Sequence, residues 1–218
     1  MAYTKVTPEI LSSLKKITGD EFVINDEYNL EIYSKDYTED FRFPPEVIVK
    51  PETPEHISEI IKLANQFKIP VYPRGGGTGL SGGALPVLGG ICLSMERFNK
   101  ILELDELNFQ AIVQPGVITE VFQMECEKKN MYYPPDPASR GSCTLGGNLA
   151  ECAGGPRAVK YGVTKDYILG IEFVSPTGEI INTGARTIKN VTGYNLTQLI
   201  IGSEGTLGVI TKIGRAHV

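Results

Sequence analysis

Residues 73–83 read Pro-Arg-Gly-Gly-Gly-Thr-Gly-Leu-Ser-Gly-Gly, and this stretch decides how the rest of the chain is interpreted. It follows a predicted strand at 69–72 and contains more glycine than a simple turn needs. Successive backbone N–H groups that carry no side chains form a concave anion-binding surface. Thr78 and Ser81 add hydroxyl donors, and Arg74 adds a fixed positive charge. We therefore expect a phosphate or pyrophosphate cradle, with a flexible glycine-rich connector as the alternative.

Two familiar phosphate-binding loops do not fit this stretch. A Walker loop ends in Lys followed by Ser or Thr, and no such pair follows the last glycine. A dinucleotide-binding GxGxxG loop leads directly into a helix, whereas Pro86 and Gly89-Gly90 follow here. The predicted cradle therefore belongs to neither of these two kinds of nucleotide site.

Upstream of the cradle the sequence predicts a βαβ unit. Thr7-Pro8 and Thr53-Pro54 each begin a helix, because Thr is a favoured N-cap and Pro is favoured at the first helical position. The second of these helices lies between short strands at 47–49 and 69–72, so the two strands are expected to be parallel. Residues 20–45 have no clean period and are interpreted as an extended lead-in segment.

Downstream the sequence predicts strands at about 90–95, 101–105 and 109–114 and a helix from Thr119 to about Lys129. Residues 168–182 are predicted to form a hairpin around Pro176-Thr177-Gly178, residues 195–201 a helix, and residues 208–211 a strand. Residues 133–167 are interpreted as one long, loop-rich stretch. A loop of that length inside a compact domain is usually functional.

Composition restricts the class of protein. The chain has 218 residues, 41% of them hydrophobic, and a formal net charge of -5. No concentrated basic face is evident, which argues against a nucleic-acid partner. No run approaches the roughly 18 apolar residues of a membrane span. The four cysteines form no CxxC pair, so a zinc ribbon or redox dithiol is not expected, and we predict a soluble cytoplasmic protein with reduced thiols.

The cradle is one of several segments rich in small residues and proline. Taken in order, the segments PRGGGTGLSGG (73–83), PPDPASRGSCTLGGNLAECAGG (134–155), RAVKYGVTKDYILGIEFVSPTGEI (157–180) and IGSEGTLGVIT (201–211) resemble the vanillyl-alcohol oxidase / p-cresol methylhydroxylase (PCMH) superfamily of flavoproteins. The resemblance covers about residues 40–212. It is strongest to the branch of glycolate oxidase FAD subunits and D-lactate dehydrogenases.

The resemblance implies an α+β fold, a PCMH-type FAD-binding domain made of two small α+β subdomains with the C-terminal cap domain missing. It places an N-terminal helix and lead-in segment at 1–40 and the FAD-binding domain at 41–212. It further implies that the isoalloxazine ring accepts a hydride from a D-2-hydroxyacid such as lactate or glycolate. An electron-transfer flavoprotein, an iron–sulfur subunit or quinone would then accept the electrons.

The same resemblance assigns FAD contacts to residues of four segments. The cradle residues would hold the pyrophosphate, residues 135–155 the flavin ring and its linker, Tyr161-Gly162 would complete the wall, and Val209-Ile210 would add main-chain contacts. The full set is Pro73, Arg74, Gly75, Gly76, Gly77, Thr78, Gly79, Ser81, Gly82, Pro135, Asp136, Ser142, Cys143, Thr144, Gly147, Asn148, Gly154, Gly155, Tyr161, Gly162, Val209 and Ile210.

Some relatives link the flavin covalently to a histidine in the first glycine loop. Thr78 stands at that position here and no histidine is nearby, so FAD is expected to be non-covalent. Cys143 could react with the flavin or sense redox state, but a small packing role is the favoured interpretation. The histidines are His56, on a predicted helix surface, and His217, so no metal site is expected. Catalytic residues cannot be assigned from this chain.

The last residues depart from the family pattern. Residues 212–218 resemble the translation of a sequencing-library adaptor, and we expect 213–218 to be a non-native tail on a truncated reading frame. The alternative is a natural, short FAD-domain protein. Three functions follow: the flavin part of a 2-hydroxyacid oxidoreductase that is inactive alone, a stand-alone FAD-binding module that needs a separate catalytic subunit, or, with less support, a UDP-N-acetylenolpyruvoylglucosamine reductase.

Overall fold

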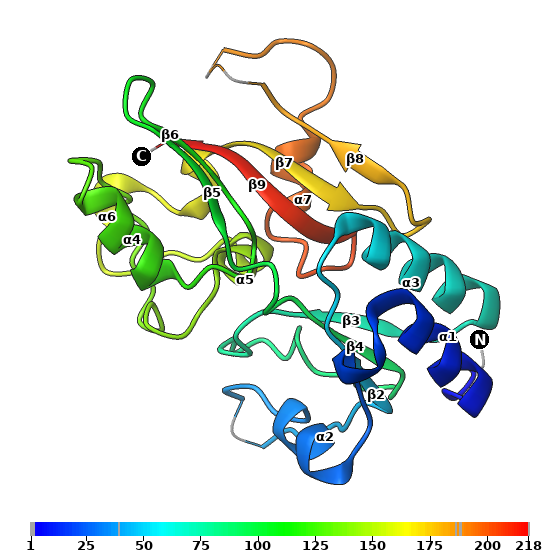
Figure 1. Cartoon of the computed structure of the whole chain (residues 1–218). Helices are drawn as coiled ribbons and strands as arrows, with labels where there is room; N and C mark the ends of the chain where they lie inside the picture. The colour runs from blue at the N-terminus through cyan, green and yellow to red at the C-terminus, as the bar shows by residue number, and fades with distance from the viewer. Residues whose placement is uncertain (1–2, 39, 186, 188, 218) are drawn as a thin grey trace.

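The computed structural model describes residues 3–38, 40–185, 187 and 189–217, with the backbone alone for 215–217. Figure 1 shows the chain running from an N-terminal helical unit to a larger second sheet. Along the chain the elements are α1 (Pro8–Thr18), η1 (Asp20–Phe22), β1 (Val23–Ile24), α2 (Glu27–Tyr33), β2 (Val47–Val49), α3 (Pro54–Phe67), β3 (Val71–Arg74), β4 (Ile91–Ser94), β5 (Ile101–Asp105), β6 (Gln110–Val113), α4 (Thr119–Glu127), α5 (Leu145–Glu151), α6 (Ala158–Tyr161), η2 (Thr164–Tyr167), β7 (Ile168–Val174), β8 (Ile180–Asn182), α7 (Leu196–Ile200) and β9 (Val209–His217).

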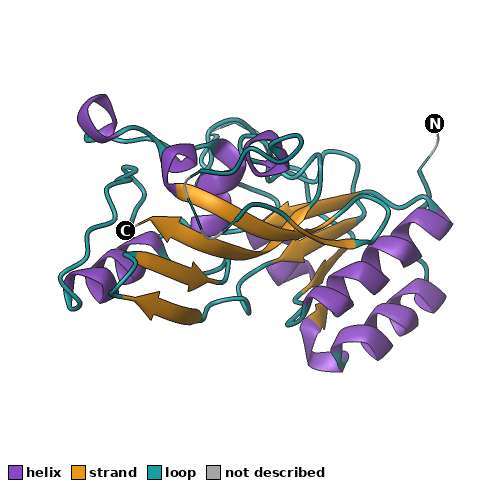
Figure 2. Ribbon diagram, turned by 90° about the horizontal axis from the view of Figure 1, so that it is seen from above, coloured by secondary structure: helices purple, strands orange, loops and turns teal. Residues whose placement is uncertain are grey.

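The first unit is a four-stranded sheet in the order β1-β2-β4-β3, with α1 and α3 packed beside it (Figures 1 and 2). Both helices begin as the sequence predicts: the side chains of Thr7 and Thr53 accept hydrogen bonds from the backbone N–H groups of Ile10 and His56. β2 and β3 are parallel, as expected for a βαβ unit, but each pairs with β4, which lies between them.

The second unit is a five-stranded antiparallel sheet in the order β5-β6-β9-β7-β8. The predicted hairpin is confirmed as β7 and β8. The predicted strand at 208–211 is longer than expected, because β9 continues to His217 between β6 and β7. Ile213 pairs with both Val113 and Ile171 and is 1% exposed. Residues 213–217 are therefore part of the sheet.

Each sheet has its own hydrophobic core, which agrees with the prediction of two small α+β subdomains. One core joins α1 and α3 to the first sheet, and the other joins α4 and α5 to the second. The two units meet where α3 contacts the β7–β8 turn. There the Ser58 hydroxyl donates to the Gly178 carbonyl and the Asn65 amide donates to the Pro176 carbonyl at 2.7 Å.

Two sequence interpretations were wrong. Residues 20–45 are not simply extended, because α2 forms within them and Asp26 caps it by accepting from the Asn29 N–H. Residues 133–167 are not one loop, because α5, α6 and η2 interrupt them. Both helical segments are short and rich in residues that give no clear helical period, so hydrophobic periodicity could not reveal them.

None of the described helices combines the length and apolar character needed to cross a lipid bilayer.

Candidate functional site

A cavity of about 260 Å³ lies between the two units. The end of β3, the glycine-rich segment that follows it, the start of α5 and the start of β9 all contribute to its wall. Predicted site residues that line it are Pro73, Arg74, Gly75, Gly76, Gly77, Thr78, Gly79, Cys143, Thr144, Gly147, Asn148, Val209 and Ile210. The fold thus brings together three segments that are far apart in the sequence.

The glycine-rich segment lies directly against the loop that precedes α5. A Cβ added to Gly76 would overlap the carbonyl oxygen of Ser142, and one added to Gly75 would overlap the hydroxyl of Thr144. Gly76 has no positive φ, so close approach of two backbones is the reason for glycine there. Gly77 has a φ of +65°, a conformation that residues with a side chain rarely adopt.

Arg74 lies behind Gly77 and turns part of its charge away from the cavity. Its side chain donates through Nη2 to the carbonyl of Lys35 at 2.6 Å, and its guanidinium lies 5.4 Å from the centre of the Tyr33 ring. The residue is 8% exposed, and its buried Nη1 has no partner among the described residues. Arg74, which lines the cavity, thus has one buried donor without a partner among the described residues.

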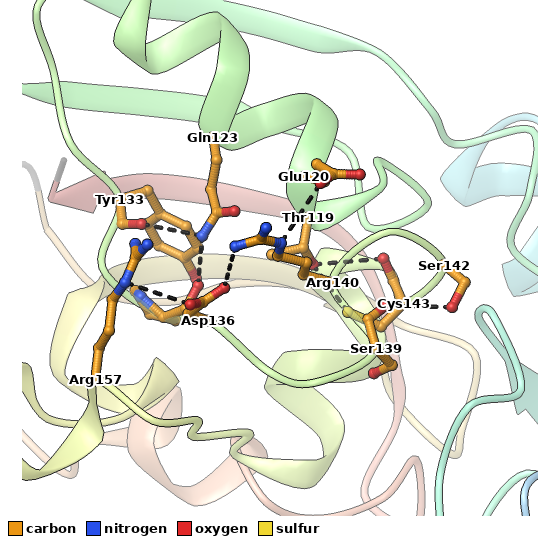
Figure 3. Close-up of polar contacts among 11 residues, drawn as sticks. Thr119, Glu120, Gln123, Tyr133, Asp136, Ser139, Arg140, Ser142, Cys143 and Arg157 are labelled. Carbon is orange, nitrogen blue, oxygen red and sulfur yellow. Dashed lines mark hydrogen bonds and ion pairs between the residues drawn. The ribbon is translucent and has the colours of Figure 1, made fainter.

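A buried polar network fixes the start of α5. The Asn148 amide donates to the Thr119 hydroxyl at 2.6 Å. That hydroxyl lies 3.2 Å from the sulfur of Cys143, as Figure 3 shows. All three residues are less than 5% exposed. Thr119 was not predicted as a site residue, because in sequence it reads only as the beginning of α4. Its contacts with Cys143 and Asn148 appear only once the chain is folded.

A second polar cluster, centred on Asp136, supports the loop around the cavity (Figure 3). The Asp136 carboxylate pairs with Arg140 at 3.1 Å and with Arg157 at 3.3 Å, and Arg140 also pairs with Glu120 at 3.4 Å. The Asp136 side chain is only 13% exposed. Its carboxylate is therefore engaged with two arginines, which ties residues 135–140 to the segment that begins α6.

The remaining predicted residues do not line the cavity. Ser142 and Gly155 pack through backbone contacts, with Gly76 and Asp136 respectively. Tyr161 packs edge-on against Tyr132 with ring centres 5.8 Å apart. Ser81, Gly82, Pro135, Asp136, Ser142, Gly154, Gly155, Tyr161 and Gly162 are not among the residues that line it.

Two acidic residues that the sequence did not suggest do line the cavity, Glu151 at the end of α5 and Glu204 in the segment after α7. The Ser81 hydroxyl lies 3.1 Å from one Glu151 oxygen and 2.9 Å from one Glu204 oxygen. Burial raises the pKa of Glu151, the charge of Glu204 raises it further, and the hydrogen bond with Ser81 opposes the rise. The described residues bring no three metal-ligating His, Cys, Asp or Glu side chains together.

Comparisons with known proteins identify the family. The chain matches a family described as FAD binding domain over residues 45–184. It is 42% identical over 207 residues to the glycolate oxidase subunit GlcD of Bacillus subtilis and 43% identical over 211 residues to a D-lactate dehydrogenase of Anaerostipes hadrus. These alignments cover 95% and 97% of this chain. The chain spans 44% of the length of each relative.

Solved structures agree on the fold. An alkyldihydroxyacetonephosphate synthase superposes with a TM-score of 0.84 at 27% identity, over 99% of this chain and 44% of that one. A p-cresol methylhydroxylase superposes with a TM-score of 0.75 at 24% identity, over 97% and 44%. The fold predicted from the sequence, a PCMH-type FAD-binding domain, is confirmed. The chain therefore belongs to the FAD binding domain family, and its cofactor is FAD.

Proposed function

We propose that the cavity between the two units holds FAD and that this chain is the flavin-binding part of an oxidoreductase acting on a D-2-hydroxyacid. The observation that carries the proposal is the contact of the glycine-rich segment with the loop before α5. There two backbones meet so closely that Gly75 and Gly76 leave no room for a Cβ. Such a wall allows a large, flat ligand to approach main-chain donors.

The residues at the wall fit the parts of FAD. Residues 75–79 offer main-chain N–H groups to the pyrophosphate, and the free Nη1 of Arg74 adds positive charge behind them. Cys143, Thr144 and Asn148 would lie along the flavin, with Thr119 holding Cys143 and Asn148 in place. Asp136, by its pairs with Arg140 and Arg157, would position this loop rather than contact the cofactor.

When bound, FAD supplies the ring that accepts a hydride. The protein must then hold that ring, exclude water from it and leave one face open to substrate. Lactate- or glycolate-like substrates are proposed because relatives that this chain matches are named for them. An electron-transfer flavoprotein or an iron–sulfur subunit is proposed as the partner that removes the electrons.

Reconstitution tests the cofactor site. The purified chain mixed with FAD and freed of excess should show flavin absorbance in proportion to protein. Acid or heat precipitation should release the flavin into the supernatant, because Thr78 offers no group that could link it covalently. Absence of flavin after reconstitution would contradict the site, and flavin that stays on the precipitated chain would contradict non-covalent binding.

A stand-alone FAD-binding module that needs a separate catalytic subunit is the second candidate, because one relative that the chain matches is named as a subunit. In the relatives' remaining length, we propose, lie the groups that take the hydroxyl proton and fix the substrate carboxylate. The 218-residue chain loaded with FAD should then show no dye-linked oxidation of D-lactate, D-glycerate or glycolate. Turnover within about tenfold of a full-length homologue would place the catalytic groups within residues 1–218.

A further inference from the structure

Ser81 lies between two carboxyl groups at the wall of the cavity. Its hydroxyl oxygen is 3.1 Å from Glu151 Oε1 and 2.9 Å from Glu204 Oε2. The glycine-rich segment runs directly beneath the same groups, since a Cβ on Gly79 would stand 3.1 Å from Glu151 Oε1. The hydrogen-bonded group of Glu151, Ser81 and Glu204 thus borders the part of the cavity where the pyrophosphate is proposed to bind.

The number of protons available to this group limits the charge that its two carboxyl groups can carry. A serine hydroxyl has one proton, so it donates to one carboxylate and must accept from the other. Both contacts are exposed to solvent. Where a bound cofactor shields them from water, two ionised glutamates would set lone pair against lone pair in one of the two short oxygen–oxygen contacts. One proton held on the glutamate pair satisfies both contacts. Burial and the charge of Glu204 raise the pKa of Glu151, which also favours a proton on the pair.

Other charged groups around the pair favour that proton further. The charge of Asp36 also raises the pKa of Glu151, and the buried Oδ2 of Asp36 has no partner among the described residues. Arg74, 8% exposed, lines the same cavity, and its buried Nη1 likewise has no partner among those residues. The carboxyl groups of Glu151 and Glu204 therefore line the same cavity as one buried arginine, at a wall where the cofactor's diphosphate would bring more negative charge.

We propose that Glu151 and Glu204 share one proton through Ser81 and that FAD binding at this wall is coupled to holding that proton. The inference rests on the proposed placement of FAD in the cavity. Bound cofactor removes water from the pair and adds negative charge beside it, and both effects favour the protonated form. Protein that has lost the proton therefore binds FAD more weakly, and affinity falls as pH rises through the titration of the pair.

The test measures the dissociation constant of FAD by flavin fluorescence between about pH 5.5 and about pH 8.5. In the unaltered chain the constant should rise with pH, by up to about tenfold per pH unit for one coupled proton. Glu151→Gln and Glu204→Gln should each remove most of this dependence, because either change leaves only one titratable carboxyl group beside Ser81. His56→Gln is the control: His56 lies on α3 and is not among the residues that line the cavity, so the pH dependence should remain.

A second measurement does not need FAD. In the chain labelled with ¹³C at the glutamate carboxyl groups, one resonance should titrate above the ordinary glutamate range and should lose that behaviour in both Gln variants. A carboxyl titration in the ordinary range overturns the shared proton. FAD affinity that is independent of pH, or a pH dependence that survives both Gln variants, overturns the coupling. A chain that binds no FAD at any pH overturns the proposed site and its coupling, while the titration still decides whether the pair shares a proton.

Discussion

The backbone carbonyl of Ser142 occupies the space in which a side chain on Gly76 would begin. Because the obstacle is backbone, it cannot move aside as the end of a flexible side chain would. The contact joins the glycine-rich segment to the loop before α5, and both line the cavity through neighbouring residues. A side chain at Gly76 must therefore push apart two segments that would together hold the cofactor.

Gly76→Val is expected to weaken FAD binding by at least about tenfold, since overpacking at a close contact typically costs about 1–3 kcal/mol. Flavin content after reconstitution measures the effect. Lys128→Ala is the matched control, because Lys128 pairs with Glu125 on the exposed side of α4. Gly79→Val separates binding from folding: a side chain there faces the flexible Glu151 carboxylate and enters the cavity. Wild-type flavin content in both valine variants would mean that the segment is only a connector.

Asp136→Asn should destabilise the chain, because the carboxylate that pairs with Arg140 and Arg157 is only 13% exposed. We expect the free energy of unfolding to fall by about 1–3 kcal/mol, between the values for exposed and fully buried pairs. Urea denaturation measures this. Glu125→Gln, which breaks an exposed pair with Lys128, should change it by less than about 1 kcal/mol. Equal effects of the two changes would show that the Asp136 cluster is no more than surface charge.

Glu96 should contribute to acid sensitivity. Burial raises its pKa, but hydrogen bonds from Lys50 at 2.6 Å and from the Tyr33 hydroxyl at 2.9 Å outweigh burial and hold the pKa below the ordinary 4.5. A depressed carboxyl pKa stabilises the fold above the unfolded value, and this stability is lost as pH falls through the folded value.

Glu96→Gln should therefore reduce the loss of thermal stability between about pH 5 and about pH 3, by no more than about 1 kcal/mol because the side chain is half exposed. Melting temperatures across a pH series measure the change. Glu59→Gln, on the exposed face of α3, should leave the acid dependence as it is. If the melting temperature of Glu96→Gln falls with pH as steeply as that of the unaltered chain, Glu96 does not contribute to the acid sensitivity.

The cysteines should differ in reactivity. Burial raises the pKa of Cys92 and of Cys126 to about 12, so neither forms thiolate near neutral pH in the folded chain. Cys152 is only half-buried, and Cys143 lines the cavity. Iodoacetamide should modify Cys152 first and should reach Cys92 and Cys126 only on unfolding. FAD should slow modification of Cys143, as peptide mass spectrometry would show. Early labelling of Cys92 would contradict the buried placement of β4.

Local signals predicted much of the fold. Thr53-Pro54 fixed the start of α3 because capping depends on neighbouring residues alone, and the glycines of 75–79 indicated close backbone contact before any partner was known. Asp136 was predicted as a cofactor contact, but its pairs with two arginines could not be foreseen, because both arginines lie in segments without a periodic pattern. The hydrogen-bonded group of Glu151, Ser81 and Glu204 was missed for a different reason. Ser81 lies 70 and 123 residues from its two partners, and no local pattern encodes such a contact.

β9 gives the molecule a definite order of assembly. It follows β6 and β7 along the chain yet lies between them, so neither has its final neighbour until residues 209–217 have been synthesised. On the ribosome, β5–β6 and β7–β8 can each form a hairpin early. Until β9 pairs with them, β6 and β7 remain edge strands with unpaired backbone groups. Emergence of residues 209–217 from the ribosome then lets the larger sheet close in one step. A nascent chain that ends before Val209 should accordingly remain protease-sensitive throughout its second half, while the unit that contains α1 and α3 already resists digestion.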